Sequence, residues 1–162
     1  MAVVIAPVFF DTSVLVAGLI ELGPTAEPAQ RIMTTVAEGR LNRPYTAWHC
    51  CLEFFSVTTR LPAAFRLKPA DALRLLEGEI LARFQIWQLP EDAQSRFFRQ
   101  IVQEGVTGGR IYDAHIGEIA RESGAKIIVT DNRRHFGTLL SHPIQVLSTV
   151  EFCEQLELTG YR

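Results

Sequence analysis

The chain alternates between short strand-like runs of β-branched and aromatic residues and segments in which apolar residues recur every three or four positions. The runs, at residues 3–10, 85–88, 126–130 and 144–147, are rich in β-branched and aromatic side chains, which is typical of buried strands. The spaced pattern predicts helices over residues 26–38, 47–59, 71–84, 90–103, 112–123 and 150–156. Strands that alternate with helices indicate a parallel sheet covered by helices on both faces. The run at residues 3–10 supports this, because it is apolar throughout.

Length and composition refine this picture only slightly. The 162 residues, 48% of them hydrophobic and 21% charged, contain no repeat, low-complexity tract or long linker. We therefore expect one domain over residues 1–162. A formal net charge of −2 gives no overall attraction for polyanions. A nucleic-acid substrate would need a local basic patch, and cations at any acidic site.

The cysteines and the N-terminal segment indicate the cellular compartment of the protein. Cys50, Cys51 and Cys153 are odd in number and two are adjacent, a poor pattern for disulfides or metal binding. Residues 1–10 lack the basic region of a signal peptide and are too short to span a bilayer. We expect a cytoplasmic protein.

Two of the five aspartates follow apolar runs directly. Asp71 and Asp92 fall in the first turns of predicted helices, where a carboxylate interacts favourably with the helix dipole. Asp11, in contrast, ends the run Val8-Phe9-Phe10, and Asp131 follows residues 127–130. Both are expected at the carboxyl ends of strands, where open α/β sheets bind their ligands.

Two further acidic residues lie in apolar helical surroundings. Glu53 is flanked by apolar residues on both sides, and Asp113 opens the predicted helix 112–123. A charge in such a place is costly unless it is paired or bound to a metal. Carboxylates that converge suit Mg²⁺ or Mn²⁺, ions that activate water for phosphodiester hydrolysis.

Each acid also has an ordinary structural explanation. Asp11 is a good N-cap for a helix starting at residue 12 or 13, and Asp113 a good N-cap after the Gly108-Gly109 loop. Glu53 fits an exposed helix position, and Asp131-Asn132 fits a turn. Each explanation competes well alone. The four acids together favour a metal site.

Other phosphoryl-transfer and hydrolase classes lack their signatures. The chain has no G-x-x-x-x-G-K-[ST] loop and no G-x-S-x-G elbow. A haloacid-dehalogenase-like phosphatase needs a second aspartate two residues after Asp11, where Ser13 stands. The glycine pair at 108–109 does not make a dinucleotide fingerprint.

The ordered motifs resemble those of the PIN-domain family. The four segments, which together span nearly the whole chain, are Val8-Phe9-Phe10-Asp11-Thr12-Ser13-Val14-Leu15, Glu53-Phe54-Phe55-Ser56-Val57, Gly109-Arg110-Ile111-Tyr112-Asp113-Ala114-His115-Ile116 and Ile128-Val129-Thr130-Asp131-Asn132-Arg133-Arg134-His135-Phe136. The resemblance implies a three-layer α/β/α sandwich around a parallel sheet and a Mg²⁺- or Mn²⁺-dependent endonuclease, usually acting on RNA. Many small members are VapC-type toxins, commonly homodimeric and inhibited by a cognate antitoxin.

The resemblance also assigns roles to residues. It makes Asp11, Glu53 and Asp113 metal ligands and catalytic residues, with the hydroxyls of three neighbouring residues, Thr12, Ser13 and Thr130, beside them. The fourth acid of the family falls two positions after the threonine, where this chain has Asn132. Either Asp131 replaces it, or Asn132 supplies a neutral oxygen and Asp131 points elsewhere.

Three arginines are the candidates for binding the RNA backbone. Arg110, Arg133 and Arg134 adjoin the acidic motifs and are candidates for phosphate contacts, although Arg133 and Arg134 also suit a solvated turn. The uncertain fourth acid keeps open a catalytically weak module that binds RNA or a protein. A preference for DNA stays open too.

Overall fold

A computed structural model describes residues 6–42, 44–141 and 143–159. Its five short strands are β1 (Val8–Phe10), β2 (Tyr45–Ala47), β3 (Gln85–Trp87), β4 (Ile127–Val129) and β5 (Gln145–Leu147). They form one sheet in the order β3-β2-β1-β4-β5, and every neighbouring pair is parallel. The central strand β1 aligns Phe9 with Tyr45 of β2 and with Ile128 of β4. The predicted parallel sheet is confirmed.

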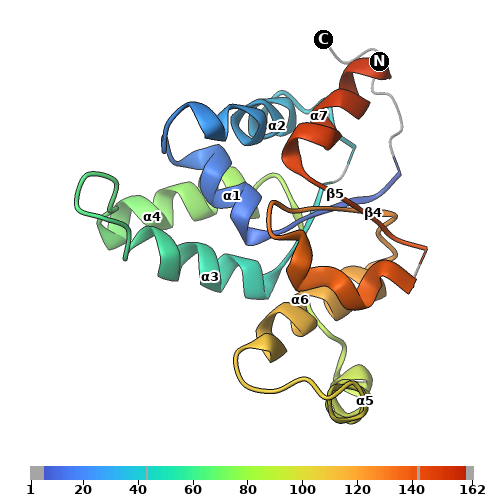
Figure 1. The fold of residues 1–162 in the computed structure, drawn as a ribbon. Coiled ribbons are helices and arrows are strands. Elements are labelled where there is room, and N and C mark those ends of the chain that lie inside the picture. Colours follow the sequence, from blue (N-terminus) through green and yellow to red (C-terminus); the bar gives the residue numbers. More distant parts are fainter. Residues whose placement is uncertain (1–5, 43, 142, 160–162) are drawn as a thin grey trace.

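Helices lie on both sides of this sheet, which confirms the α/β/α sandwich (Figure 1). The α-helices are α1 (Thr12–Leu19), α2 (Glu27–Ala37), α3 (Trp48–Thr58), α4 (Pro69–Leu75), α5 (Glu91–Gln103), α6 (Arg110–Glu122) and α7 (Thr149–Leu158). Short helical turns occur at Pro24–Ala26, Leu76–Leu81 and Arg133–Ser141. Helices α2 and α7 lie on one side of the sheet and α6 on the other (Figure 1).

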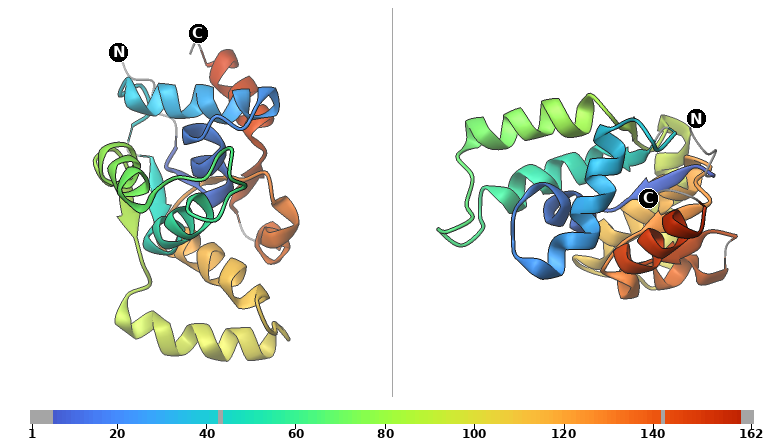
Figure 2. Two further views of the ribbon diagram at one scale, coloured as in Figure 1. Left: turned by 90° about the vertical axis from the view of Figure 1, so that its left-hand side faces the viewer. Right: turned by 90° about the horizontal axis from the view of Figure 1, so that it is seen from above.

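Two parts of the molecule extend away from the sheet. Helices α3 and α4 run side by side as an arm beyond the strand ends, and α5 lies outside α6 (Figures 1 and 2). α5 packs its apolar stripe, Ala93, Phe97 and Ile101, inward, as expected for an amphipathic helix. None of the helices in the described part of the chain is long and apolar enough to cross a membrane.

The aromatic core fixes the central strand. Phe10 is fully buried and meets Phe84 and Phe152 edge to face, with ring centroids 5.9 and 5.6 Å apart, a geometry that the ring quadrupoles favour. Phe152 comes from α7 and Phe84 precedes β3, so the core joins distant parts of the chain. This packing holds the end of β1, and Asp11 with it, in a fixed place.

Some predicted boundaries were wrong. The predicted helix 71–84 ends as α4 at Leu75 and continues as a π-helical turn, Leu76–Leu81. Strand β2 was missed because its three residues, Tyr-Thr-Ala, give too short an apolar run. The predicted strand 3–10 is observed as Val8–Phe10, and its residues 3–5 lie outside the described part.

Candidate metal-binding site

Asp11 lies where β1 ends and α1 begins. Its backbone N–H donates to the carbonyl oxygen of Val129, which continues the pairing of β1 with β4 (3.1 Å). The side chain is 5% exposed, and its Oδ2 accepts hydrogen bonds from Thr130 Oγ1 (2.8 Å) and Ser13 Oγ (3.2 Å). Asp11 occupies the N-cap position of α1 but forms no side-chain capping bond. The carboxylate is therefore held by hydroxyls rather than used as a helix cap.

The surroundings of Asp11 disfavour its charged form. Burial raises the pKa of this carboxyl most strongly; the Thr130 hydrogen bond lowers it, and the charge of Glu53 raises it again. A buried carboxylate that faces another negative charge is the electrostatic environment in which a cation is most stabilising.

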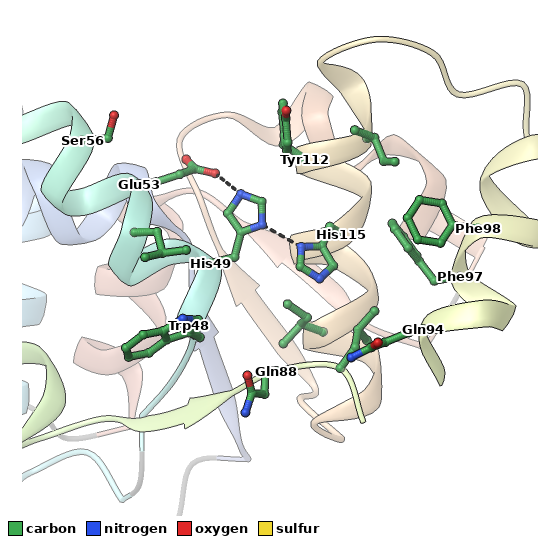
Figure 3. A pocket seen from close by; sticks show the side chains of 14 residues that line it. Trp48, His49, Glu53, Ser56, Gln88, Gln94, Phe97, Phe98, Tyr112 and His115 are labelled. Atoms are coloured by element: carbon green, nitrogen blue, oxygen red, sulfur yellow. Dashed lines mark hydrogen bonds and ion pairs between the residues drawn. The ribbon is translucent and has the colours of Figure 1, made fainter. Parts of the chain in front are cut away.

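Glu53 projects from α3 and is paired with a histidine of the same helix. Glu53 Oε1 lies 2.9 Å from His49 Nε2, an i,i+4 pair, and its side chain is 36% exposed. His49 Nδ1 in turn lies 2.7 Å from Nδ1 of His115 on α6. Figure 3 shows the three side chains in a row from α3 to α6. In this contact one Nδ1 donates and the other accepts.

Asp113 lies one turn inside α6. The helix begins at Arg110 after the N-cap Gly109, so the alternative that Asp113 is itself the N-cap is wrong. Its Oδ1 is 3.3 Å from His135 Nδ1. Burial raises the pKa of Asp113; His135 lowers it, and the charge of Glu53 raises it.

Glu53 thus raises the pKa of both aspartates, which places the three carboxylates in one electrostatic environment. Glu53 and Asp113 each bond to an imidazole, and Asp11 bonds to hydroxyls. Within residues 6–42, 44–141 and 143–159, no three histidine, cysteine, aspartate or glutamate side chains are grouped so as to hold a metal ion. The charge of Glu53 thus acts on both aspartates, but the three acids form no closed coordination shell among the described residues.

Asp131 and Asn132 follow β4 but do not bond to Asp11. The Asp131 carboxylate accepts from the backbone N–H of Thr149 (3.0 Å) and from its hydroxyl (3.0 and 3.1 Å). It therefore faces the start of α7. The backbone N–H of Asn132 donates to Thr130 Oγ1 (3.0 Å), which ties this residue to the hydroxyl that holds Asp11.

The candidate hydroxyls and arginines differ in their surroundings. The Ser13 hydroxyl contacts Asp11, whereas that of Thr12 is buried and makes no hydrogen bond to it. Arg133 pairs with a glutamate of α7 and donates to a backbone carbonyl. Arg110 and Arg134 are exposed, and neither forms an ion pair with another residue in the described part of the chain.

Sequence reasoning missed the histidines that hold Glu53 and Asp113. The i,i+4 spacing of His49 and Glu53 on one helix face was a usable signal. Glu118, three residues after His115 on the same helix, is buried in an ion pair with Arg121. The contact between α3 and α6 that joins the two histidines depends on tertiary packing and left no pattern in the sequence.

The fold and the acidic motifs define a PIN domain, and the chain belongs to the PIN-domain family. The sequence pattern of this family matches residues 7–134. The chain is 35% identical over 126 residues to Ribonuclease VapC40 of Mycobacterium tuberculosis, covering 76% of this chain and 85% of that protein.

Two further comparisons agree with this family. Ribonuclease VapC27 of Mycobacterium tuberculosis is 36% identical over 85 residues, which is 52% of this chain and 60% of that protein. The crystal structure of VapC20 from the same organism, described as a toxin that cleaves the sarcin–ricin loop, superposes with a TM-score of 0.60. That match has 15% identity and covers 85% of this chain and 98% of the other, so it supports the fold alone.

Proposed function

We propose that this chain is a Mg²⁺- or Mn²⁺-dependent endoribonuclease, and that residues 1–162 form its single domain. The observation that carries the proposal is the buried Asp11 carboxylate, whose pKa is raised by burial and by the charge of Glu53. Family membership and the two ribonuclease relatives support the same activity.

The side chains around Asp11 suit a hard divalent cation. Asp11, Glu53 and Asp113 offer carboxylate oxygens, which Mg²⁺ and Mn²⁺ prefer. The nearby Cys50 is unsuited to act as a soft thiolate ligand, because burial raises the pKa of its thiol to about 12. We therefore assign the three carboxylates as metal ligands. A bound ion of this kind lowers the pKa of water and stabilises charge on the phosphate oxygens.

The protein's own residues orient the reaction. Thr130 and Ser13 fix Asp11, while His49 and His135 hold Glu53 and Asp113. The reaction is hydrolysis: water oxygen bonds to phosphorus, and one P–O ester bond breaks to leave a hydroxyl end and a phosphate end. Arg110 and Arg134 are the arginines best placed to contact phosphates, because Arg133 already has a carboxylate partner.

The fourth position is assigned to Asn132 rather than Asp131. Both oxygens of Asp131 accept from Thr149, which occupies this side chain at the start of α7. Asn132 is tied through its backbone to Thr130, the partner of Asp11. A neutral oxygen in place of a fourth carboxylate leaves less negative charge, so any second cation binds more weakly than the first.

We further propose that the chain is the toxin of a toxin–antitoxin pair, that it forms a homodimer, and that a cognate antitoxin inhibits it. The naming of its relatives as VapC ribonucleases supports this role. Co-expression with the product of an adjacent small gene, followed by co-purification and loss of nuclease activity, tests the pairing. Light scattering of the purified chain tests the homodimer.

The nuclease proposal is tested by cleavage of an unstructured RNA with Mn²⁺. We expect cutting by the wild type, loss of cutting with Asp11→Asn and Asp113→Asn, and full cutting with Asp71→Asn. Asp71 is the matched control because it pairs with Arg74 on the surface of α4. Cutting that survives in the Asp11 variant contradicts the assignment.

One observation favours a second candidate, a module that binds RNA or protein without cutting it. The carboxylates do not form a closed metal site within the described residues, and Asp131 is bound elsewhere. This alternative predicts RNA binding that is equal with Mn²⁺ and with EDTA, and no cleavage under either condition. Replacing the RNA by single-stranded DNA in the same assay distinguishes a DNA-directed nuclease.

A further inference from the structure

A cavity of about 640 Å³ opens beside the acidic site. Its walls come from three helices, α3, α5 and α6, and from the segment after β3 (Figure 3). The volume falls within the range of roughly 300–1,000 Å³ that is usual for small-ligand sites. Since α5 lies outside the main body, this cavity depends on how α5 packs on α6.

Large aromatic side chains line the cavity and remain open to solvent. Trp48 is 47% exposed, Tyr112 61% and Phe98 60%. Figure 3 shows Trp48 on α3, Tyr112 on α6 and Phe98 on α5, so each helix contributes one exposed aromatic residue, and α5 adds the buried Phe97. Exposed aromatic residues gathered around one hollow mark a binding site more often than chance exposure.

The cavity also offers neutral hydrogen-bonding groups. The side-chain amides of Gln88 and Gln94 line it, together with the imidazole of His115. No lysine or arginine is among the lining residues in the part of the chain that the structure describes. An anionic group alone would find no cationic partner there, whereas a planar, uncharged, hydrogen-bonding ring would find both stacking surfaces and polar partners.

The cavity is continuous with the acidic site. Glu53 belongs to both, since its side chain lines the cavity and it is one of the three carboxylates assigned to the metal. The hydrogen-bonded row from Glu53 through His49 to His115 forms the shared wall, with distances of 2.9 and 2.7 Å. A group bound in the cavity therefore lies beside one of the three carboxylates assigned to the metal.

We infer that this cavity binds an unpaired nucleobase of a single-stranded RNA segment, held among the aromatic rings of Trp48, Tyr112 and Phe98, next to the phosphate that is cut. The inference rests on the proposed nuclease function and adds a base-binding subsite to it. A base pair would not fit the same role, because the stacking faces and edge contacts require a base that is free of its partner.

Fluorescence of Trp48 tests the inference directly. The chain has two tryptophans, and Trp87 packs on Tyr45 instead of lining the cavity. Trp87→Phe leaves Trp48 as the single reporter. Titration with hexauridylate or hexaadenylate in EDTA, where no metal-dependent cutting occurs, is expected to quench Trp48 saturably. Inorganic phosphate at the same charge concentration is expected to leave the emission unchanged.

Variants identify the stacking residues. In the Trp87→Phe background, Tyr112→Ala and Phe98→Ala should each weaken hexanucleotide binding by about 5- to 150-fold, the usual effect of losing one base stack. Phe65→Ala is the matched control, because Phe65 is 40% exposed and does not line the cavity. Absence of quenching, or equal affinity of the Tyr112 and Phe65 variants, overturns the inference.

The remaining outcomes separate this inference from the nuclease proposal. Cutting with Mn²⁺ but no quenching of Trp48 rejects the base site and retains the nuclease. Quenching without any cutting retains the base site and rejects the nuclease. If Trp48→Ala lowers the mass of the free protein in light scattering, a second copy of the chain covers the cavity, and the base site is rejected.

Discussion

Replacing Thr130 by valine should weaken both the fold and the acidic site. Thr130 is fully buried, and its hydroxyl donates to Asp11 Oδ2 (2.8 Å) while accepting from the backbone N–H of Asn132 (3.0 Å). Valine keeps the shape and removes both bonds. A hydrogen bond to a charged group contributes about 1.5–3 kcal/mol, and a neutral one about 1 kcal/mol. We expect the free energy of unfolding to fall by about 2–4 kcal/mol at neutral pH.

The pH dependence distinguishes loss of this hydrogen bond from a general packing defect. The Thr130 hydroxyl lowers the pKa of Asp11, so valine raises that pKa further in the folded protein. The stabilisation from this bond is present while Asp11 is ionised and is lost as the pH falls through its folded-state pKa. The difference between wild type and Thr130→Val should therefore be largest at neutral pH and shrink in acid.

Urea unfolding in EDTA at several pH values measures this difference. A change of this size corresponds to a drop in Tm of roughly 4–16 °C for a chain of this length. Thr130→Ser is the matched control, because it keeps the hydroxyl and removes one methyl group at a cost of about 1 kcal/mol that does not depend on pH. A Thr130→Val difference below 1 kcal/mol, or one that stays constant in acid, refutes the role given to Thr130.

Three more outcomes follow from other parts of the molecule. Asp131→Asn should lower the free energy of unfolding by about 1 kcal/mol, because it weakens the hydrogen bonds to Thr149, and should leave the Mn²⁺ affinity unchanged. A lower affinity in calorimetry would show that Asp131, and not Asn132, is the fourth ligand. Gly18→Ala should destabilise by about 1–3 kcal/mol in urea, since a Cβ there would come within 2.2 Å of Met33, and an unchanged midpoint contradicts the tight packing of α1 on α2. Cys50 should resist alkylation at pH 8 in the native protein, because burial raises the pKa of its thiol to about 12, and it should react once the protein is unfolded. Peptide mass spectrometry measures the labelling, and rapid labelling of the native protein would contradict the burial of this thiol.

The centre of the sheet could be predicted because β1 and β4 are buried along their whole length. Both strands are apolar runs, Val-Phe-Phe and Ile-Ile-Val, as is typical of the buried strands of a parallel sheet. The sequence of β2, Tyr-Thr-Ala, does not by itself predict a strand. Its backbone pairing with β1 and β3, a tertiary contact, makes it one. The π-helical turn at Leu76–Leu81 was equally hidden, since its apolar spacing is that of an ordinary helix.

The positions of candidate site residues that directly follow a strand could be predicted from the sequence. The directions of their side chains, which depend on tertiary packing, could not. Asp11 lies where its apolar run predicted, and a threonine after β4 reaches its carboxylate. Asp131 has the same sequence signature, yet its side chain turns to Thr149 because the N-terminus of α7 lies close to it. Sequence position places a residue at the sheet edge, but the neighbouring helix decides where its carboxylate points.

Calorimetric titration with Mn²⁺ tests most directly whether Asp11, Glu53 and Asp113 form one metal site. Wild type and Asp71→Asn are expected to bind with equal affinity. Asp11→Asn, Glu53→Gln and Asp113→Asn should each weaken binding strongly, with Asp131→Asn close to wild type. Absence of Mn²⁺ binding by the wild type, or unchanged affinity in all three acidic variants, would contradict a shared metal site at the end of β1.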